Sequence, residues 1–250
     1  MNDFCYGAKL ASEEDSQLKL SDFADLAKLP TPPRVFGHGL DLVFGMLANN
    51  SVGDCVIAGG MHEEMAWGSE VRQVPPFTAQ VAVDEYSAIT GYVPGNPLTD
   101  LGTDMGVAAK YRRVTGLKDA NGARHKILAY LKIWPLSLDY ILTAAYCLGA
   151  TGVGVAITMA DEAQFSQGIP WTPVPFSPVK GMHYVPILGR NSHGNFLLVT
   201  WGRLHAATPE WMQNRVGQAF TYISPTPFDV HGKTPEGFNI DDLNRVLASL

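Results

Sequence analysis

Residues 49–58 read NNSVGDCVIA, a stretch that places a cysteine directly after a Gly-Asp pair. Gly53 and Asp54 indicate a turn followed by a helix N-cap, so we expect a helix over about residues 55–67. Cys55 would then lie in the first turn, where unpaired backbone N–H groups and the positive end of the helix dipole favour a negative charge. The stretch therefore predicts a cysteine whose thiol pKa lies below the ordinary value of about 8.5.

A histidine and a Trp-Gly pair follow the cysteine in an order that suits a thiol–imidazole pair. Residues 181–185 read GMHYV, residues 198–202 read LVTWG, and His183 follows Cys55 by 128 positions. His183 would accept the thiol proton and later protonate the leaving group. Asn49, six residues before the cysteine, could donate its side-chain amide to a developing oxyanion. The alternative for Cys55 taken alone is a small buried apolar side chain.

Together these motifs resemble those of the papain-like cysteine peptidases, in which Gln, Cys, His and Asn-Ser-Trp-Gly follow one another at similar intervals. The matching positions are Asn49, Cys55, His183 and the pair Trp201-Gly202. The Gly-Asp-Cys motif looks more like papain-fold proteins carried by bacteriophages and bacteria than like secreted proteases. The resemblance covers roughly residues 45–225. It implies an α+β, papain-like two-lobed fold with a helical first half, an antiparallel β-sheet in the second half and a cleft between them.

The chain departs from the family pattern at two positions. The Asn that precedes Ser-Trp-Gly in the family falls on Val199, whose side chain cannot orient an imidazole, whereas Thr200 could do so through its hydroxyl. Val56 follows the cysteine where papain has a large aromatic residue. The loss of a third catalytic residue often lowers the rate without abolishing the nucleophile–base pair. Thr200 therefore joins the three candidate catalytic residues of the preceding motifs.

Two functions remain open at this stage. The first is a cysteine peptidase or amidase that acts on a peptide or protein substrate through an acyl-enzyme on Cys55. The second is a papain-fold structural or interaction protein, for example a virion component among partner chains, with little or no catalysis. The retained Cys55, His183 and Asn49 favour the first, and the missing Asn favours the second.

Composition excludes several other classes of protein. The chain has 250 residues, of which 46% are hydrophobic, and this is enough for one substantial core. A net charge of −6, with 18 scattered basic residues, argues against a nucleic-acid-binding surface. No stretch approaches the roughly 20 apolar residues of a membrane span, and the start of the chain lacks the basic and apolar segments of a secretory signal. We therefore expect a cytoplasmic or virion location, without a membrane partner.

Other motifs are weaker and predict neither a metal nor a cofactor. His62 precedes two glutamates but lacks the second histidine four residues later that a zinc-binding helix needs. The glycines of residues 149–154 run into a predicted strand without a following Lys-Ser or Lys-Thr, so they do not indicate a phosphate-binding loop. Three cysteines imply no disulfide framework, and Cys147 lies in an apolar run that predicts a core position. His193 and His205 are expected in surface loops.

The chain divides into an N-terminal, Pro-rich arm over residues 1–40 and a papain-like domain over residues 41–250. Residues 29–33 read LPTPP, which favours an extended polyproline conformation. The arm lies where the family resemblance would place a propeptide or a strap, and a strap should bring residues 29–33 close to Cys55. The alternative is an arm that only packs against its own domain. Residues 171–178, also rich in proline, could form one rim of the cleft or an interface with another protein.

Start and stop signals, together with hydrophobic periodicity, predict the main elements. The expected helices cover residues 21–28, 55–67, 78–89, 103–116 and 137–148, a short segment from residue 208, and residues 239–249. The expected strands cover residues 125–133, 151–158, 183–189, 195–201 and 218–224, with a hairpin connection at residues 191–194. This order of helices first and strands second is typical of the α+β class.

Overall fold

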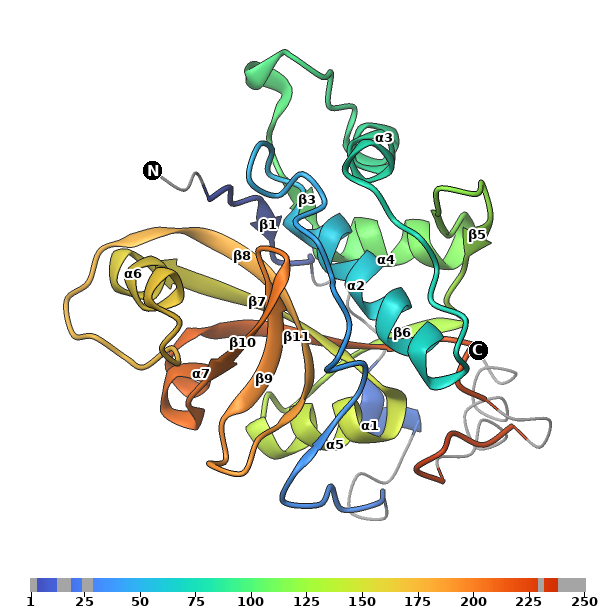
Figure 1. Ribbon diagram of the computed structural model, residues 1–250, viewed down its shortest axis with the longest axis vertical. Coiled ribbons are helices and arrows are strands. Elements are labelled where there is room, and N and C mark those ends of the chain that lie inside the picture. The colour runs from blue at the N-terminus through green and yellow to red at the C-terminus, as the bar shows by residue number, and fades with distance from the viewer. Residues whose placement is uncertain (1–3, 13–18, 24–28, 229–231, 238–250) are drawn as a thin grey trace.

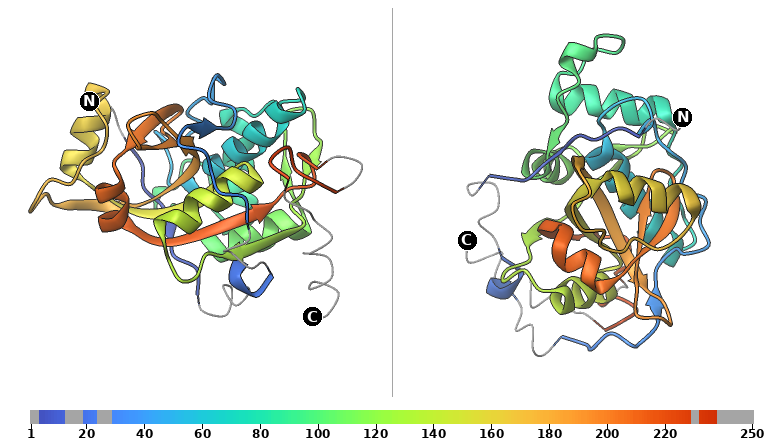
Figure 2. Two further views of the ribbon diagram at one scale, coloured as in Figure 1. Left: turned by 90° about the horizontal axis from the view of Figure 1, so that it is seen from below. Right: turned by 90° about the vertical axis from the view of Figure 1, so that its left-hand side faces the viewer.

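The computed structural model describes residues 4–12, 19–23, 29–228 and 232–237. The predicted helix over residues 239–249 lies outside the described residues, as does most of the one predicted over residues 21–28. The beginning of the latter is present as α1 (Leu20–Phe23). Figures 1 and 2 show a helical part and a sheet part that meet along one helix, α2.

Three helices, α2 (Cys55–Glu70), α3 (Ala79–Thr90) and α4 (Met105–Val114), make up the helical part. The side chain of Thr78 caps α3 by accepting from the Val81 N–H, and Gly91 ends it in the left-handed conformation. Asp104 caps α4 by accepting from two backbone N–H groups. In α2, every residue from Cys55 to Gly68 is buried, so this helix is surrounded by protein on all sides.

The sheet part contains seven antiparallel strands in the order β10-β9-β8-β7-β11-β6, with β2 paired to β8. Their bounds are β2 (Phe36–Gly37), β6 (Ala129–Lys132), β7 (Thr151–Thr158), β8 (Val179–Arg190), β9 (Phe196–Thr200), β10 (Arg203–Ala207) and β11 (Val216–Ile223). Three helices pack around this sheet, namely α5 (Leu138–Leu148), α6 (Met159–Gln167) and α7 (Pro209–Arg215). Helix α2 packs against β8, the longest of the strands.

Short elements complete the fold. A parallel pair joins β1 (Ala8–Lys9) to β3 (Thr103–Asp104), and an antiparallel pair joins β4 (Leu117–Lys118) to β5 (Arg124–His125). A 3-10 helix, η3 (Pro97–Thr99), lies in the loop after α3. Figure 1 shows β1 between the helical part and the sheet, beside β3.

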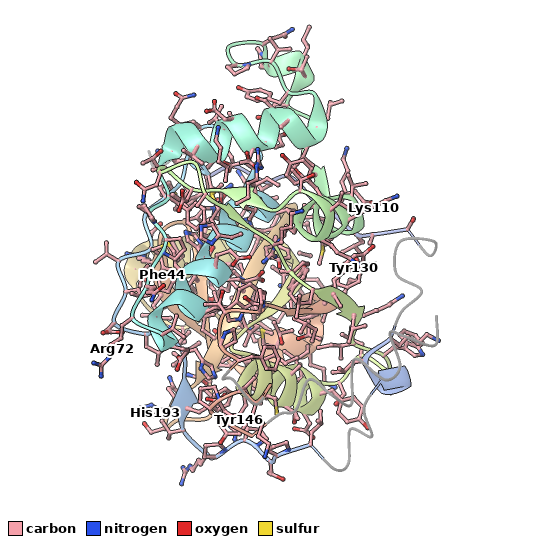
Figure 3. All side chains as sticks on the ribbon, turned by 90° about the vertical axis from the view of Figure 1, so that its right-hand side faces the viewer. Phe44, Arg72, Lys110, Tyr130, Tyr146 and His193 are labelled. Carbon is pink, nitrogen blue, oxygen red and sulfur yellow. The ribbon has the colours of Figure 1, made fainter. Side chains whose placement is uncertain are left out.

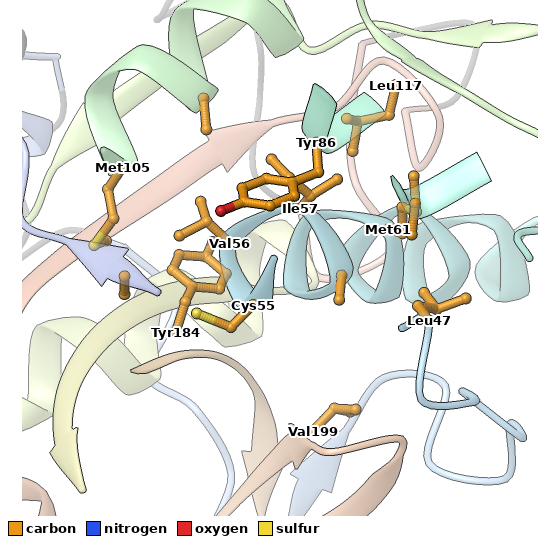
Figure 4. Close-up of a cluster of buried hydrophobic side chains, with 14 of the residues drawn as sticks. Leu47, Cys55, Val56, Ile57, Met61, Tyr86, Met105, Leu117, Tyr184 and Val199 are labelled. Carbon is orange, nitrogen blue, oxygen red and sulfur yellow. The ribbon is translucent and has the colours of Figure 1, made fainter. Parts of the chain in front are cut away.

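Apolar side chains form two buried clusters, one on each side of the junction, which is the boundary where the helical part and the sheet part meet. The first lies between the sheet and α5 and includes three tryptophans, Trp171, Trp201 and Trp211. The second surrounds α2, and Figure 4 shows its members around Cys55, with Met105, Tyr86 and Tyr184 from the neighbouring elements. Arg72 and His193 lie at the edge of the molecule in Figure 3 and are exposed, as expected for residues after a helix and in a turn.

The predicted α+β class, with helices first and an antiparallel sheet second, is confirmed. Several elements differ from the prediction. The strand expected over residues 125–133 is divided between β5 and β6, and both α6 and β10 were missed. His205, expected in a surface loop, is buried on β10. None of the helices in the described part of the chain is long and apolar enough to cross a membrane.

Candidate functional site

Cys55 is the first residue of α2, as the Gly-Asp-Cys motif predicted. Asp54 occupies the N-cap position, but its carboxyl group makes no capping hydrogen bond, which corrects the expectation that it would cap the helix. Both carboxyl oxygens are buried, and burial raises the pKa of Asp54 well above its ordinary value, although the side-chain amide of Asn49 acts in the opposite direction.

Burial dominates the surroundings of the Cys55 thiol, which is 1% exposed. Desolvation raises its pKa to about 12, and the neighbouring Asp54 adds to that rise. Backbone N–H groups of Tyr184, Gly7 and Val56 act in the opposite direction but do not offset it. The lowered thiol pKa predicted from the helix N-terminus is thus wrong for this closed arrangement, because the desolvation effect is larger. Cys147 has the expected core position, and burial raises its pKa to about 12 as well.

His183 lies on β8, where α2 packs against the strand, and its imidazole is held on two sides. Its Nε2 is 2.9 Å from the hydroxyl oxygen of Thr200, and its ring stacks on Trp201 with centroids 4.8 Å apart. Its Nδ1 is buried and has no hydrogen-bond partner among the described residues, so no hydrogen bond joins it to the Cys55 sulfur. That sulfur nevertheless lies near the backbone N–H of Tyr184, the residue after His183. Burial lowers the pKa of His183 to about 3, so the ring is neutral.

The backbone conformation of a turn explains the Trp-Gly pair. Trp201 and Gly202 form the two-residue turn between β9 and β10, and both have positive φ angles, 43° and 77°. A two-residue hairpin turn of this hand favours glycine at its second position. The turn fixes the Trp201 ring against His183 and presents Thr200, the last residue of β9, to the same imidazole.

Asn49 is also buried at this site, since only 3% of it is exposed. Its side-chain amide donates to the carbonyl of Val52 at 3.5 Å, a long and therefore weak hydrogen bond. Its own backbone carbonyl accepts a hydrogen bond from the Cys5 N–H at 3.2 Å. The four candidate residues are thus gathered where α2, β8 and β9 meet, and an N-terminal segment lies against them.

This N-terminal segment, residues 4–9, fills the junction where an open cleft was expected. Gly7 donates its N–H to the Met182 carbonyl (3.2 Å) on the sheet side, and its carbonyl accepts from the Thr103 N–H (2.7 Å) on the helical side. A Cβ atom added to Gly7 would lie 1.9 Å from the carbonyl oxygen of Gly53, so the segment fits only because residue 7 has no side chain. Residues 4–9 therefore bridge both parts of the molecule and cover Cys55.

The expectation that residues 29–33 form a strap beside Cys55 was wrong. Residues 29–33 lie elsewhere: the Pro30 carbonyl lies 3.9 Å from the Cys147 sulfur, and the Pro33 carbonyl accepts from Arg190 at 2.9 Å. No local sequence pattern marks residues 4–9, because their contacts are made with residues 49–53, 102–103 and 181–183, far along the chain. The division of the chain at residue 40 stays a prediction.

A buried ionic cluster, also missed from the sequence, links the helix that carries Cys55 to the strand that carries His183. Arg112 of α4 contacts Glu63 and Glu64 of α2, and the Tyr184 hydroxyl on β8 donates to Glu63 at 2.6 Å. Burial raises the pKa of both glutamates, and Arg112 partly offsets that rise. Within the described part of the chain, no group of three or more His, Cys, Asp or Glu side chains could hold a metal ion. His62 instead hydrogen-bonds the Gly45 carbonyl at 3.0 Å.

Comparison with known proteins identifies the fold. No protein-family model matches the chain, and no curated protein matches it. Among solved structures, xylellain, a cysteine protease from Xylella fastidiosa, aligns with a TM-score of 0.59 at 13% identity over 89% of this chain and 96% of its own. ProCathepsin B S9 from Trypanosoma congolense aligns with a TM-score of 0.64 at 12% identity over 89% and 87%. The Carica candamarcensis protease CMS1MS2, in complex with E-64, gives 0.57 at 10% identity over 77% and 99%. The chain therefore has the papain-like cysteine protease fold.

Proposed function

We propose that this papain-fold protein is a cysteine hydrolase, a peptidase or amidase, in a closed state. Cys55 is the nucleophile, His183 is the general base and Thr200 orients the imidazole. Residues 4–9 cover the site and keep both reacting groups neutral, since burial raises the pKa of Cys55 to about 12 and lowers that of His183 to about 3. The proposed activity requires this segment to leave.

The arrangement of His183 is the observation that carries this proposal. One ring nitrogen is fixed by the Thr200 hydroxyl at 2.9 Å, while the other is buried and unpaired within the described structure. A general base needs this combination, because one nitrogen sets the ring orientation and the other accepts the proton. The unpaired nitrogen belongs to the residue that precedes Tyr184, whose N–H lies near the Cys55 sulfur.

The proposed chemistry follows from returning water to this site. Solvation removes the desolvation penalty, so the thiol pKa falls, the imidazole pKa rises, and the proton can pass from Cys55 to His183. The thiolate then attacks the carbonyl carbon of an amide, and the proton on His183 goes to the departing amine. Water, deprotonated by His183, hydrolyses the resulting thioester and restores the thiol. The Cys55 N–H, with Asn49 beside it, is the proposed donor set for the oxyanion.

The second candidate is a papain-fold structural or interaction protein with little or no catalysis. The sealed site favours it, because the backbone of residues 4–9 bonds to both walls and Cys55 is only 1% exposed. Its partners would be protein chains of an assembly. Nothing in the fold itself favours a bacteriophage or virion component, so that assignment and the cytoplasmic location stay predictions.

Alkylation of Cys55 by iodoacetamide separates the two candidates. The chain is compared with a variant that carries a site-specific protease cleavage sequence within residues 13–18, so that residues 4–9 can be released after folding. In a hydrolase, release should allow Cys55 to react at pH 6, and His183→Ala should slow that reaction at least tenfold, because a thiolate at this pH depends on the imidazolium. Equal labelling rates with and without His183 would contradict the hydrolase proposal and leave the interaction protein.

A further inference from the structure

Residues 4–9 lie in the junction as an extended peptide held by main-chain hydrogen bonds. The Cys5 N–H bonds to the Asn49 carbonyl and the Gly7 N–H to the Met182 carbonyl, each at 3.2 Å. Ala8 and Lys9 then continue as β1, parallel to β3. Bonds of this kind hold a peptide without reading its side chains, as in strand addition to a sheet edge.

The side chains of the segment, in contrast, occupy positions that favour particular residue types. The Phe4 ring packs on Trp201 with centroids 4.3 Å apart and meets the edge of Phe165 at 5.5 Å. An aromatic ring at this position therefore gains contacts with two rings of the sheet part. A smaller side chain would leave those rings uncovered.

The second such position, occupied by Tyr6, favours a tyrosine. The Tyr6 hydroxyl donates a hydrogen bond to the Glu162 carboxylate on α6, and its ring meets His183 edge-on at 6.1 Å. Space for it exists because residue 181 is a glycine, at which an added Cβ would lie 2.7 Å from the Tyr6 Cβ. A phenylalanine would fit the same space but would remove the hydroxyl donor and leave the half-buried carboxylate with only Lys180, whose Nζ lies 3.9 Å away.

The third position accepts only glycine. A Cβ on residue 7 would lie 1.9 Å from the Gly53 carbonyl oxygen, and a Cβ on Gly102 would lie 2.2 Å from the Gly7 carbonyl oxygen. Backbone atoms form both walls, so neither can move aside as a flexible side chain would. The slot beside Cys55 is thus as narrow as a bare peptide backbone.

We infer that the junction is a peptide-binding groove selective for an extended segment of the pattern aromatic–any residue–tyrosine–glycine, and that residues 4–9 are its resident ligand. Substrate peptides of this pattern, carried by a second protein, bind the same groove when the resident segment leaves. The inference rests on the proposed function for the role of the site, since it names the peptide class that a hydrolase would receive there. Binding itself requires no catalysis.

The test therefore uses a chain in which Cys55→Ala removes the nucleophile and a protease site within residues 13–18 allows cleavage after folding. A fluorescent synthetic peptide of residues 2–11 is exchanged for the cleaved segment, and its displacement by unlabelled variants is followed by anisotropy. A Tyr6→Phe peptide should compete about tenfold or more weakly, as expected for a hydrogen bond to a charged group, and a Gly7→Ala peptide at least as weakly. A Lys9→Ala peptide, altered at an exposed position, is the matched control and should compete within about twofold.

A Glu162→Gln chain tests the tyrosine contact directly. There the preference for the Tyr6 peptide over the Tyr6→Phe peptide should shrink to within about threefold, because the charged acceptor is gone. Equal competition by the unlabelled parent peptide and its three variants would overturn the inference, since the groove would then recognise only the peptide backbone. A cleaved segment that never exchanges, even when it carries Gly7→Ala, would overturn it as well, because residues 4–9 would then be a permanent part of the core. Hydrolysis is measured separately in the chain that retains Cys55, so a failure of the proposed catalysis is distinguishable from a failure of peptide binding.

Discussion

A single methyl group at residue 7 should open the site. In Gly7→Ala the new Cβ would lie 1.9, 2.6 and 2.8 Å from the carbonyl oxygen, carbonyl carbon and Cα of Gly53. Ordinary Cβ contacts begin near 3.4 Å, so the backbone of residue 7 must move away by about 1.5 Å. The hydrogen bonds from the Gly7 N–H to Met182 and from the Thr103 N–H to the Gly7 carbonyl cannot both be kept over such a shift.

The magnitude follows from these contacts. Overpacking of a tight site typically costs about 1–3 kcal/mol, and the weakened hydrogen bonds contribute within that range. This cost falls on the closed state of the segment alone, so the open fraction should rise by about 5- to 150-fold. The alkylation rate of Cys55 should rise by the same factor, because the closed thiol is buried and protonated.

Iodoacetamide labelling at pH 8 with peptide mapping measures this rate, and the chain contains its own control. Cys147 is fully buried in the cluster between the sheet and α5, with the Pro30 carbonyl 3.9 Å from its sulfur, so its labelling reports opening of that cluster and not of the Cys55 site. Lys9→Ala, at an exposed position of the same segment, should leave the labelling of both cysteines unchanged. If Gly7→Ala leaves Cys55 unlabelled, or raises Cys55 and Cys147 together, the segment is not a separate cover and the reasoning fails.

Three further predictions concern the buried polar groups. Arg112→Met should lower the free energy of unfolding in urea by about 3–5 kcal/mol at pH 8, because two buried glutamates lose their counter-charge, and by less at pH 5, where these glutamates can take up protons. Lys180→Met, which breaks a more exposed ion pair with Glu162, should cost about 0–1 kcal/mol and serves as its control. Burial lowers the pKa of His62 to about 4, so the unfolded chain takes up a proton as the pH falls through 6.5 while the folded chain does not. The stability of the wild type relative to His62→Gln should therefore drop by about 1.5 kcal/mol between pH 6.5 and 5, and a constant difference would contradict this. Thr200→Val should slow the His183-dependent alkylation of Cys55 at pH 6 by about two- to tenfold in the chain whose N-terminal segment has been released, and an unchanged rate would show that the hydroxyl does not orient the ring.

Elements with local end signals were predictable from the sequence. Thr78 and Gly91 bound α3, and Ser137 and Gly149 flank α5, as their residue types indicated. A similar signal was available for the missed α6, because Thr158 and Asp161 form a reciprocal capping box at its start. No such signal marks β10, which carries an arginine and a histidine. It becomes a strand through its pairing with β9.

The positions of several candidate site residues in the secondary structure were also predictable from the sequence, because each has a local pattern. Cys55 at a helix start, His183 in a strand and Thr200 beside a Trp-Gly turn each have a local pattern. The contact between Gly7 and Gly53 has none, since it depends on two backbones that approach without side chains. The buried Arg112 cluster likewise depends on how α4 packs against α2, which no periodicity specifies.

The protonation state of Cys55 shows why the missed contact matters more than the recognised motif. A helix N-terminus stabilises a nearby negative charge by about 0.3–1 kcal/mol, and by about 2 kcal/mol at most, which corresponds to a pKa change of less than two units. Burial acts in the opposite direction and carries the thiol pKa to about 12. Burial is the larger of these effects, and it depends on residues 4–9, which cover Cys55. The N–H of Gly7 in this segment lies beside the Cys55 sulfur. Under the proposed function, the same Cys55 and His183 are inert or reactive according to whether this segment occupies the groove, and the Gly-Asp-Cys motif alone does not distinguish these two proposed states.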